Sequence, residues 1–185
     1  MEIVRIFDDD SILTVRFEGH ETDAFSQIFI DWTDIEFLDD FFTKNEADLK
    51  HEFWGQISLE DAVITTRNEA IKFYDYIKSI ADKTVNHRIS LFRKLFKPLT
   101  KVLLQNRAFE MKKAYGLRTK TWLRIYALKI DDDMFIITGG ALKLTDSMYK
   151  REHTREELRK LERCTDYLKE NSIIDKDGML DYLEL

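Results

Sequence analysis

A cationic and aromatic strip is predicted on one strand in the second half of the chain. In "TWLRIYALKI", residues 121–130, strand alternation places three apolar side chains on one face, namely Leu123, Ile125 and Ala127. The opposite face then carries Trp122, Arg124 and Tyr126. The apolar face is typical of a core. The other face offers a guanidinium that could bind an anionic group.

The charge distribution also predicts anion binding in this region. Residues 83–129 contain 13 Lys and Arg, and their only acidic residue is Glu110. By contrast, residues 1–82 contain 7 basic and 20 acidic residues, and the whole chain has a net charge of −6. A local excess of cations is what binding to a polyanion requires. Docking of the basic segment on the acidic first half of the same chain is the alternative.

Two adjacent glycines raise a separate question about chemistry. "FIITGGALKL", residues 135–144, has neither the glycine spacing of a phosphate-binding loop nor a helix directly after it. A two-residue hairpin turn would leave "ALKL" as a very short strand. We therefore expect a strand that continues through Gly139 and Gly140 with a bulge or a close approach of another group. Without a bulge, Lys143 shares the face of Phe135 and Ile137, and the neighbouring strand could set it beside Arg124 or Tyr126. A single bulge would reverse this assignment.

The strands that would position these residues are indicated by alternation. Strands at 2–7 and 11–17 flank an acidic turn at Asp8–Asp10, and strands at 121–130 and 134–144 flank a second acidic turn at 131–133. Both pairs are predicted to be antiparallel hairpins, because only a short turn separates their strands.

Three helices are predicted from capping signals followed by helical apolar spacing. Thr33 with Glu36 starts the first, Ser58 with Asp61 starts a long helix over 59–82, and Thr154 with Glu157 starts the last. Gly55 is expected to form a turn, Pro98 to prevent a long helix at 83–117, and Gly178 to begin a short tail. The predicted fold is α+β, a mostly antiparallel sheet of about four to six strands with two long helices from the first half and a C-terminal helix.

Composition excludes several classes of protein. No apolar run approaches the roughly 20 residues that span a bilayer, and the acidic start lacks a signal peptide pattern, so we expect a cytoplasmic protein without membrane contact. Cys164 is the only cysteine and is expected to be a buried helix residue. The scattered histidines do not predict a metal site. Residues 1–185 are interpreted as a single domain.

A series of segments resembles a known family. "FKPL", "FEMKKAYG", "LRIYALKI", "MFIITGGALKL" and a capped helix at "HTREEL" occur in this order. The series, over about residues 95–170, resembles the RelE/HigB-type toxin superfamily of bacterial toxin–antitoxin systems. The chain departs from the family in its enlarged N-terminal half, in a basic insertion near 83–117, and in Met111 and Lys112 where the family usually has Leu-Arg.

The resemblance implies a metal-independent endoribonuclease that cleaves messenger RNA, often on the ribosome, and needs no cofactor. Its partners would be RNA or the ribosome and a cognate antitoxin protein. Such a site binds phosphate, activates a 2′-hydroxyl and stabilises negative charge in the transition state. The resemblance assigns catalytic roles to Arg124, Lys143, Tyr126 and His153. It assigns RNA binding to Lys112, Lys113, Arg118, Lys120 and Trp122.

Each of these residues also has a structural interpretation. Arg124 could pair with a helix carboxylate, Tyr126 could only pack its ring, Lys143 could keep a strand end soluble, and His153 could belong to a helix start. A non-catalytic RNA- or protein-binding member of the same fold is therefore the alternative function. The sequence does not specify the oligomeric state.

Overall fold

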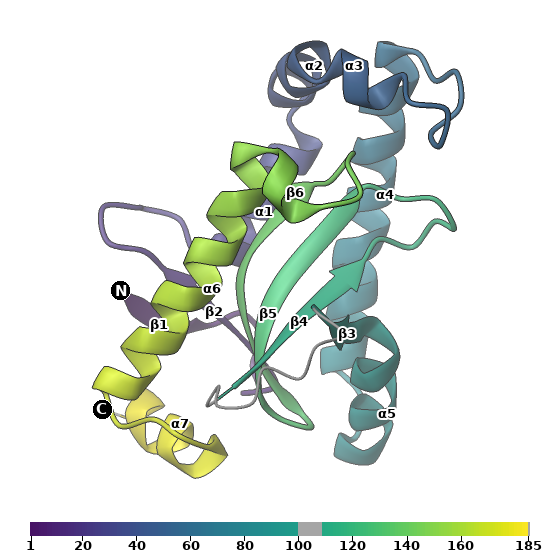
Figure 1. Ribbon diagram of the computed structural model, residues 1–185. Coiled ribbons are helices and arrows are strands. Elements are labelled where there is room, and N and C mark those ends of the chain that lie inside the picture. Colours follow the sequence, from purple (N-terminus) through teal and green to yellow (C-terminus); the bar gives the residue numbers. More distant parts are fainter. Residues whose placement is uncertain (100–108, 185) are drawn as a thin grey trace.

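The computed structural model describes residues 1–99 and 109–184, and its centre is one mixed sheet (Figure 1). Within these residues the sheet has six strands in the order β1-β2-β6-β5-β4-β3. The strands are β1 Glu2–Arg5, β2 Ile12–Arg16, β3 Phe96–Pro98, β4 Glu110–Tyr115, β5 Leu123–Asp131 and β6 Met134–Leu142. All neighbours pair antiparallel except β2 and β6, which are parallel. The predicted α+β class with a mostly antiparallel sheet is confirmed.

Helices cover both faces of the sheet, as Figure 1 shows. The helices are α1 Ala24–Thr33, α2 Ile35–Lys44, α3 Glu46–Leu49, α4 Leu59–Ala81, α5 Val85–Leu95, α6 Glu152–Glu170 and α7 Lys176–Leu183, with a short 3-10 turn at Met148–Lys150. One core cluster joins the sheet to α1, α2, α4 and α5. The second cluster joins the opposite face to α6 and α7. The sheet therefore lies between two helical layers.

Of the helix starts predicted from capping signals in the first half of the chain, one is confirmed and one is wrong. Ser58 caps α4 by accepting a hydrogen bond from the backbone N–H of Asp61, as predicted. The predicted start at Thr33 is wrong, because Asp34 accepts the N–H groups that begin α2, while Thr33 ends α1 and donates to Phe29. The sequence interpretation missed α1 altogether. Instead of two long helices, the first half has one long helix and several short ones.

The capping box predicted for the C-terminal helix is also wrong. The last long helix begins at Glu152, and the Thr154 hydroxyl donates to the carbonyl oxygens of Met148 and Arg151 instead of capping. Glu157 does not reach back to the helix start, because its carboxylate is buried against β6. The predicted tail after Gly178 is helical in the structure, since Gly178 lies within α7. Cys164 is buried on α6, as expected.

The glycine pair lies within β6, and the expected bulge is present. Tyr126 pairs with Gly139 and Ala127 pairs with Ile137, so Thr138 is the extra residue. This bulge reverses the faces of the residues beyond it. Lys143 therefore lies on the side of Arg124 and Tyr126, away from the face of Ile137. The hairpin-turn alternative for the two glycines is wrong.

The first part of the basic segment docks on acidic residues of the same chain. Arg88 of α5 is 11% exposed and pairs with Asp9 in the β1–β2 turn and with Asp133 in the β5–β6 turn. The exposed Arg93 pairs with Asp132. This part of the basic segment therefore has a structural role, and residues 100–108 of the predicted insertion lie outside the described part of the chain. None of the helices in the described ranges combines the length and apolar character needed to cross a bilayer.

Candidate anion-binding pocket

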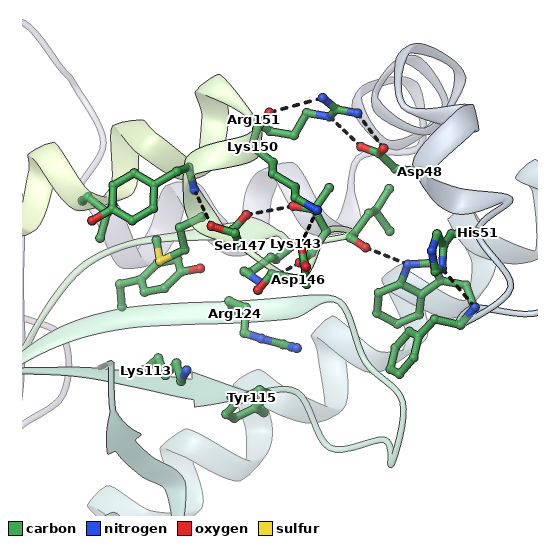
Figure 2. A pocket seen from close by; sticks show the side chains of 18 of the residues that line it. Asp48, His51, Lys113, Tyr115, Arg124, Lys143, Asp146, Ser147, Lys150 and Arg151 are labelled. Atoms are coloured by element: carbon green, nitrogen blue, oxygen red, sulfur yellow. Dashed lines mark hydrogen bonds and ion pairs between the residues drawn. The ribbon is translucent and has the colours of Figure 1, made fainter. Parts of the chain in front are cut away.

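A pocket of about 830 Å³ lies beside the β4–β5 part of the sheet, on the face that also carries α6 (Figure 2). Most of its lining comes from α3 and the loop that follows it, the strands β4 and β5, and the segment 143–151 after β6, with Leu99 and Leu158 of α6 in addition. Of the predicted site residues, the pocket brings together Arg124, Lys143, Tyr126 and Lys113. These residues converge because the bulge in β6 turns Lys143 toward β5.

Arg124 is held in the pocket by backbone oxygens and by an aromatic ring. Its Nη1 donates to the carbonyl oxygens of Thr121 and Leu123 at 2.8 and 2.7 Å. Its guanidinium lies 4.1 Å from the ring centroid of Tyr115, its cross-strand partner on β4. A cation over an aromatic face gains electrostatic attraction without losing its charge. Arg124 is thus oriented but remains positively charged.

Lys143 and Lys113 are held in a similar way. The Lys143 ammonium donates to the carbonyl oxygens of Thr145 and Asp146 at 2.5 and 2.8 Å. The Lys113 ammonium lies 3.4 Å from the carbonyl oxygen of Leu99 and 5.5 Å from the centroid of the Tyr115 ring. Arg124, Lys143 and Lys113 form no ion pair with a carboxylate of the described residues. This cationic cluster, Lys113, Arg124 and Lys143, is the central feature of the pocket.

The electrostatics of the cluster reflect burial and mutual repulsion. Burial lowers the pKa of Lys143, and the nearby positive charges of Arg124 and Lys113 lower this pKa further. The pKa of Arg124 is also lowered, chiefly by burial. Each of these shifts means that the charged form is less favourable than it is in water. An anion that entered the pocket would relieve this repulsion.

Two further cations at the pocket are already neutralised. Arg151 makes a bidentate pair with Asp48 of α3, with both nitrogen–oxygen distances at 2.6 Å. Lys150 pairs with Asp146 at 2.7 Å. The Arg151–Asp48 pair also ties α3 to the start of α6, as Figure 2 shows. These two basic residues therefore build the wall of the pocket, whereas the cationic cluster has no ion pair with a carboxylate of the described residues.

Tyr126 lines the pocket but has an unusual environment. Its side chain is fully buried, and its hydroxyl has no hydrogen-bond partner among the described residues. Burial raises its pKa, and the nearby Glu157 carboxylate raises this pKa further. The hydroxyl therefore stays protonated and is a donor without an acceptor in the described part of the chain.

Other predicted site residues lie away from the pocket lining. His153 lies beside Phe41, and its Nε2 donates to the carbonyl oxygen of Leu142 at 3.1 Å. Burial lowers the pKa of His153. Trp122 is 2% exposed and donates from Nε1 to Thr66 of α4. The expectation that Trp122 shares the face of Arg124 is wrong, because Trp122 precedes β5 and packs in the core formed with α4.

Lys112, Arg118 and Lys120 differ in their relation to the pocket. Lys112 points to the opposite face of β4 from Lys113, where it is buried and pairs with Glu110 at 2.6 Å. Lys120 lies at the rim, because its ammonium donates to the carbonyl oxygen of Phe53 and lies over the Phe53 ring. The Arg118 guanidinium lies 5.8 Å from the centroid of the Trp122 ring.

Sequence reasoning missed the aromatic residues around the cationic cluster. Phe53, Tyr115 and Tyr149 line the pocket and are 53%, 40% and 72% exposed. His51 also lines the pocket, where its Nδ1 accepts the Phe53 backbone N–H. Alternation along "EMKKAYG" places Tyr115 on the side of Lys113 and would have identified it. Phe53 and Tyr149 lie in irregular segments, so no periodic signal marks them.

The described residues contain no group of three or more His, Cys, Asp and Glu side chains that could hold a metal ion. Comparisons with models of known protein families, with curated proteins and with solved structures gave no significant match. The fold and the pocket thus define an α+β protein with a partly buried cationic pocket.

Proposed function

We propose that the protein binds single-stranded RNA through the cationic cluster. The observation that carries this proposal is that Lys113, Arg124 and Lys143 line one pocket without a carboxylate partner among the described residues. Burying unpaired charge is unfavourable, and phosphate groups supply the missing counter-charge. The hydrogen bonds to backbone carbonyl oxygens orient the donors for such a ligand.

Exposed aromatic rings favour a nucleic acid over a simple anion. Phe53, Tyr115 and Tyr149 line the pocket with the cationic cluster, and each of these residues is exposed to solvent. Aromatic rings next to a cationic groove stack on unpaired bases, and each stacked base contributes about 1–3 kcal/mol. Bases in a duplex are already stacked and paired. The combination of cations and exposed rings therefore favours a single strand.

The rest of the surface would direct the ligand to this pocket. Residues 1–82 have a net charge of −13, which repels a polyanion. Part of the basic segment is neutralised by internal ion pairs such as Arg88–Asp9 and Arg93–Asp132. The cationic cluster, by contrast, has no ion pair with a carboxylate of the described residues.

Cleavage of messenger RNA by a RelE/HigB-like mechanism is a second candidate function. It is favoured by the position of Lys143 beside Arg124, because the lowered pKa of Lys143 makes its neutral form, which can accept a proton, more accessible than that of an ordinary lysine. Lys143 would take the proton of the 2′-hydroxyl as its oxygen attacks phosphorus. The bond from phosphorus to the 5′-oxygen of the next nucleotide would break, which leaves a 2′,3′-cyclic phosphate and a 5′-oxygen that takes a proton from Lys143 or from water. Arg124 would stabilise the charge that develops on the phosphate oxygens. The ribosome and an antitoxin protein are the partners that this second proposal implies.

Binding is tested by the fluorescence anisotropy of a labelled single-stranded RNA with wild type, Arg124→Ala and Lys143→Ala. Arg67→Ala and Lys72→Ala are matched controls, since they remove the same charge from exposed positions on α4. Each pocket variant should lose about tenfold or more in affinity and flatten the salt dependence by about 0.7 in log–log slope. Equal affinities for pocket and control variants would refute RNA binding at the cationic cluster.

Cleavage is tested separately by incubating the same RNA with each variant and by following growth after inducible expression. RNA fragments and growth arrest that disappear with Lys143→Ala, but not with Lys72→Ala, would support the endoribonuclease. Intact RNA and normal growth with all proteins, together with tight binding, would support RNA binding without cleavage.

A further inference from the structure

We propose that the pocket receives the terminal phosphate of an RNA strand or nucleotide, and not a phosphodiester from the middle of a strand. This inference rests on the proposed RNA binding and specifies which phosphate enters the cationic cluster. The shared chemistry is a phosphomonoester, which carries a charge of about −1.5 to −2 at neutral pH. An internal phosphodiester carries a single negative charge.

The charge of the pocket matches a multiply charged anion. Lys150 and Arg151 are neutralised by Asp146 and Asp48, which also line the pocket. The cationic cluster remains and gives the described lining a net charge of +3. A single charge from a phosphodiester would leave most of this excess uncompensated. A terminal phosphate would balance about half to two-thirds of it at one point.

The three cations act on one another, which indicates that they converge instead of forming a track. Arg124 and Lys113 both lower the pKa of Lys143 through their positive charge. Lys113 and Arg124 also share the ring of Tyr115, at 5.5 and 4.1 Å from its centroid. Cations that followed an extended backbone would each meet a different phosphate. This arrangement instead directs several donors to one region.

The donors left free in the cluster suit the oxygens of a terminal phosphate. The hydrogen bonds of Arg124 with the described residues use Nη1, so its Nε and Nη2 can form the two-pronged contact that guanidinium makes with phosphate. Lys143 uses two of its three N–H donors on carbonyl oxygens. A phosphomonoester has three terminal oxygens, whereas a phosphodiester has two. A phosphomonoester can therefore accept hydrogen bonds from more of these donors than a phosphodiester can.

The pocket wall also favours the end of a strand. The Arg151–Asp48 pair and a hydrogen bond from Trp54 Nε1 to the carbonyl oxygen of Leu144 join the α3 region to the segment after β6 (Figure 2). These contacts join two parts of the pocket wall, one of them the segment that begins at Lys143. A strand that passed through would need two openings, whereas a terminal nucleotide needs one.

The test compares three RNA oligonucleotides of one sequence, with a 5′-phosphate, a 3′-phosphate or hydroxyl groups at both ends, each labelled at an internal base. We expect one phosphorylated RNA to bind about tenfold tighter than the hydroxyl-ended RNA. This advantage should be lost in Arg124→Ala and Lys143→Ala and kept in Arg67→Ala and Lys72→Ala. Arg124→Lys, which keeps the charge but loses the two-pronged contact, should keep only part of it. Thermal unfolding of each variant verifies that it is folded.

The same comparison also identifies the source of the phosphate. Tighter binding of the 5′- or the 3′-phosphorylated RNA shows which terminal phosphate enters the pocket. Competition by a nucleoside monophosphate at a concentration similar to that of the RNA would assign the pocket to free nucleotides. Equal binding of all three RNAs that still depends on Arg124 would overturn the terminal-phosphate inference and leave the proposed function intact. The absence of binding by any RNA would overturn both.

Discussion

The carboxylate of Glu157 on α6 occupies the space where Gly139 of β6 lacks a side chain. A β-carbon at Gly139 would lie 1.9 Å from Glu157 Oε2. On the other face of the strand, a β-carbon at Gly140 would lie 3.0 Å from Ile28 of α1. The two glycines therefore allow one helix of each layer to pack closely against β6. Their function is close packing and not phosphate binding.

Glu157 makes the stability of the protein depend on pH. Burial raises the pKa of Glu157 to about 7, although Lys160 donates to its Oε1. Because the folded pKa exceeds the unfolded value, stability is highest below the unfolded pKa and is lost as pH rises through about 7. Glu157→Gln cannot ionise. The free energy of unfolding of Glu157→Gln minus that of wild type should therefore be about 2–3 kcal/mol larger at pH 8 than at pH 5, as measured by urea denaturation.

A matched control for this prediction is Glu170→Gln, which makes the same change at the exposed end of α6. It should alter stability by less than about 0.5 kcal/mol at both pH values. A pH-independent difference between wild type and Glu157→Gln would mean that Glu157 ionises as it does in water.

Gly140→Ala should destabilise the fold. Its β-carbon would lie 2.9 Å from the carbonyl oxygen of Arg124, a backbone atom that cannot rotate away. Overpacking of this kind typically costs about 1–3 kcal/mol in the free energy of unfolding. Gly178→Ala in α7 is the control, since its nearest contact would be 3.5 Å and alanine favours a helix. Chemical denaturation that found both variants as stable as wild type would contradict the close packing.

Tyr126→Phe should leave stability unchanged or increase it by up to about 1 kcal/mol, measured by thermal unfolding. The buried hydroxyl of Tyr126 has no partner among the described residues, and removing an unsatisfied polar group removes its desolvation cost. A loss of RNA cleavage in this variant, with its fold intact, would instead reveal a catalytic role for the hydroxyl. A marked loss of stability would indicate a hydrogen bond that Tyr126 makes in solution.

Arg88→Ala should be far more destabilising than Arg93→Ala. Arg88 is mostly buried and also donates to the carbonyl oxygen of Ala81, so its removal leaves the buried Asp133 with one cation, Lys176. Breaking a buried pair typically costs about 3–5 kcal/mol, whereas an exposed pair such as Arg93–Asp132 contributes about 0–1 kcal/mol. Similar losses in urea denaturation would show that docking of the basic segment does not stabilise the fold.

The sequence by itself determined the elements whose signals are local. Alternation around the two acidic turns predicted both strand pairs, and the cap at Ser58 with the apolar stripe after it predicted α4. Strand parity also placed Arg124 and Tyr126 on one face. These predictions succeeded because the pattern of each element depends on neighbouring residues and on one buried face.

Competition between local signals produced the errors. Asp34 and Thr33 both offer capping oxygens, and Asp34 caps α2 because Thr33 is already within α1. At the last helix, Thr154 and Glu157 have the spacing of a capping box, but the Thr154 hydroxyl donates to nearby carbonyl oxygens and the Glu157 carboxylate is buried against β6. Spacing alone does not reveal which partner a polar side chain will find.

Only the tertiary structure decided the composition of the pocket. The bulge at Thr138 moved Lys143 to the side of Arg124, and packing against α4 placed Trp122 in the core. Phe53 and Tyr149 reach the same pocket from segments almost 100 residues apart. A one-residue change of register reverses every later side chain of a strand, and distant loops meet only after the chain has folded. The sequence could therefore indicate the cations, whereas the fold decided which of them share a site.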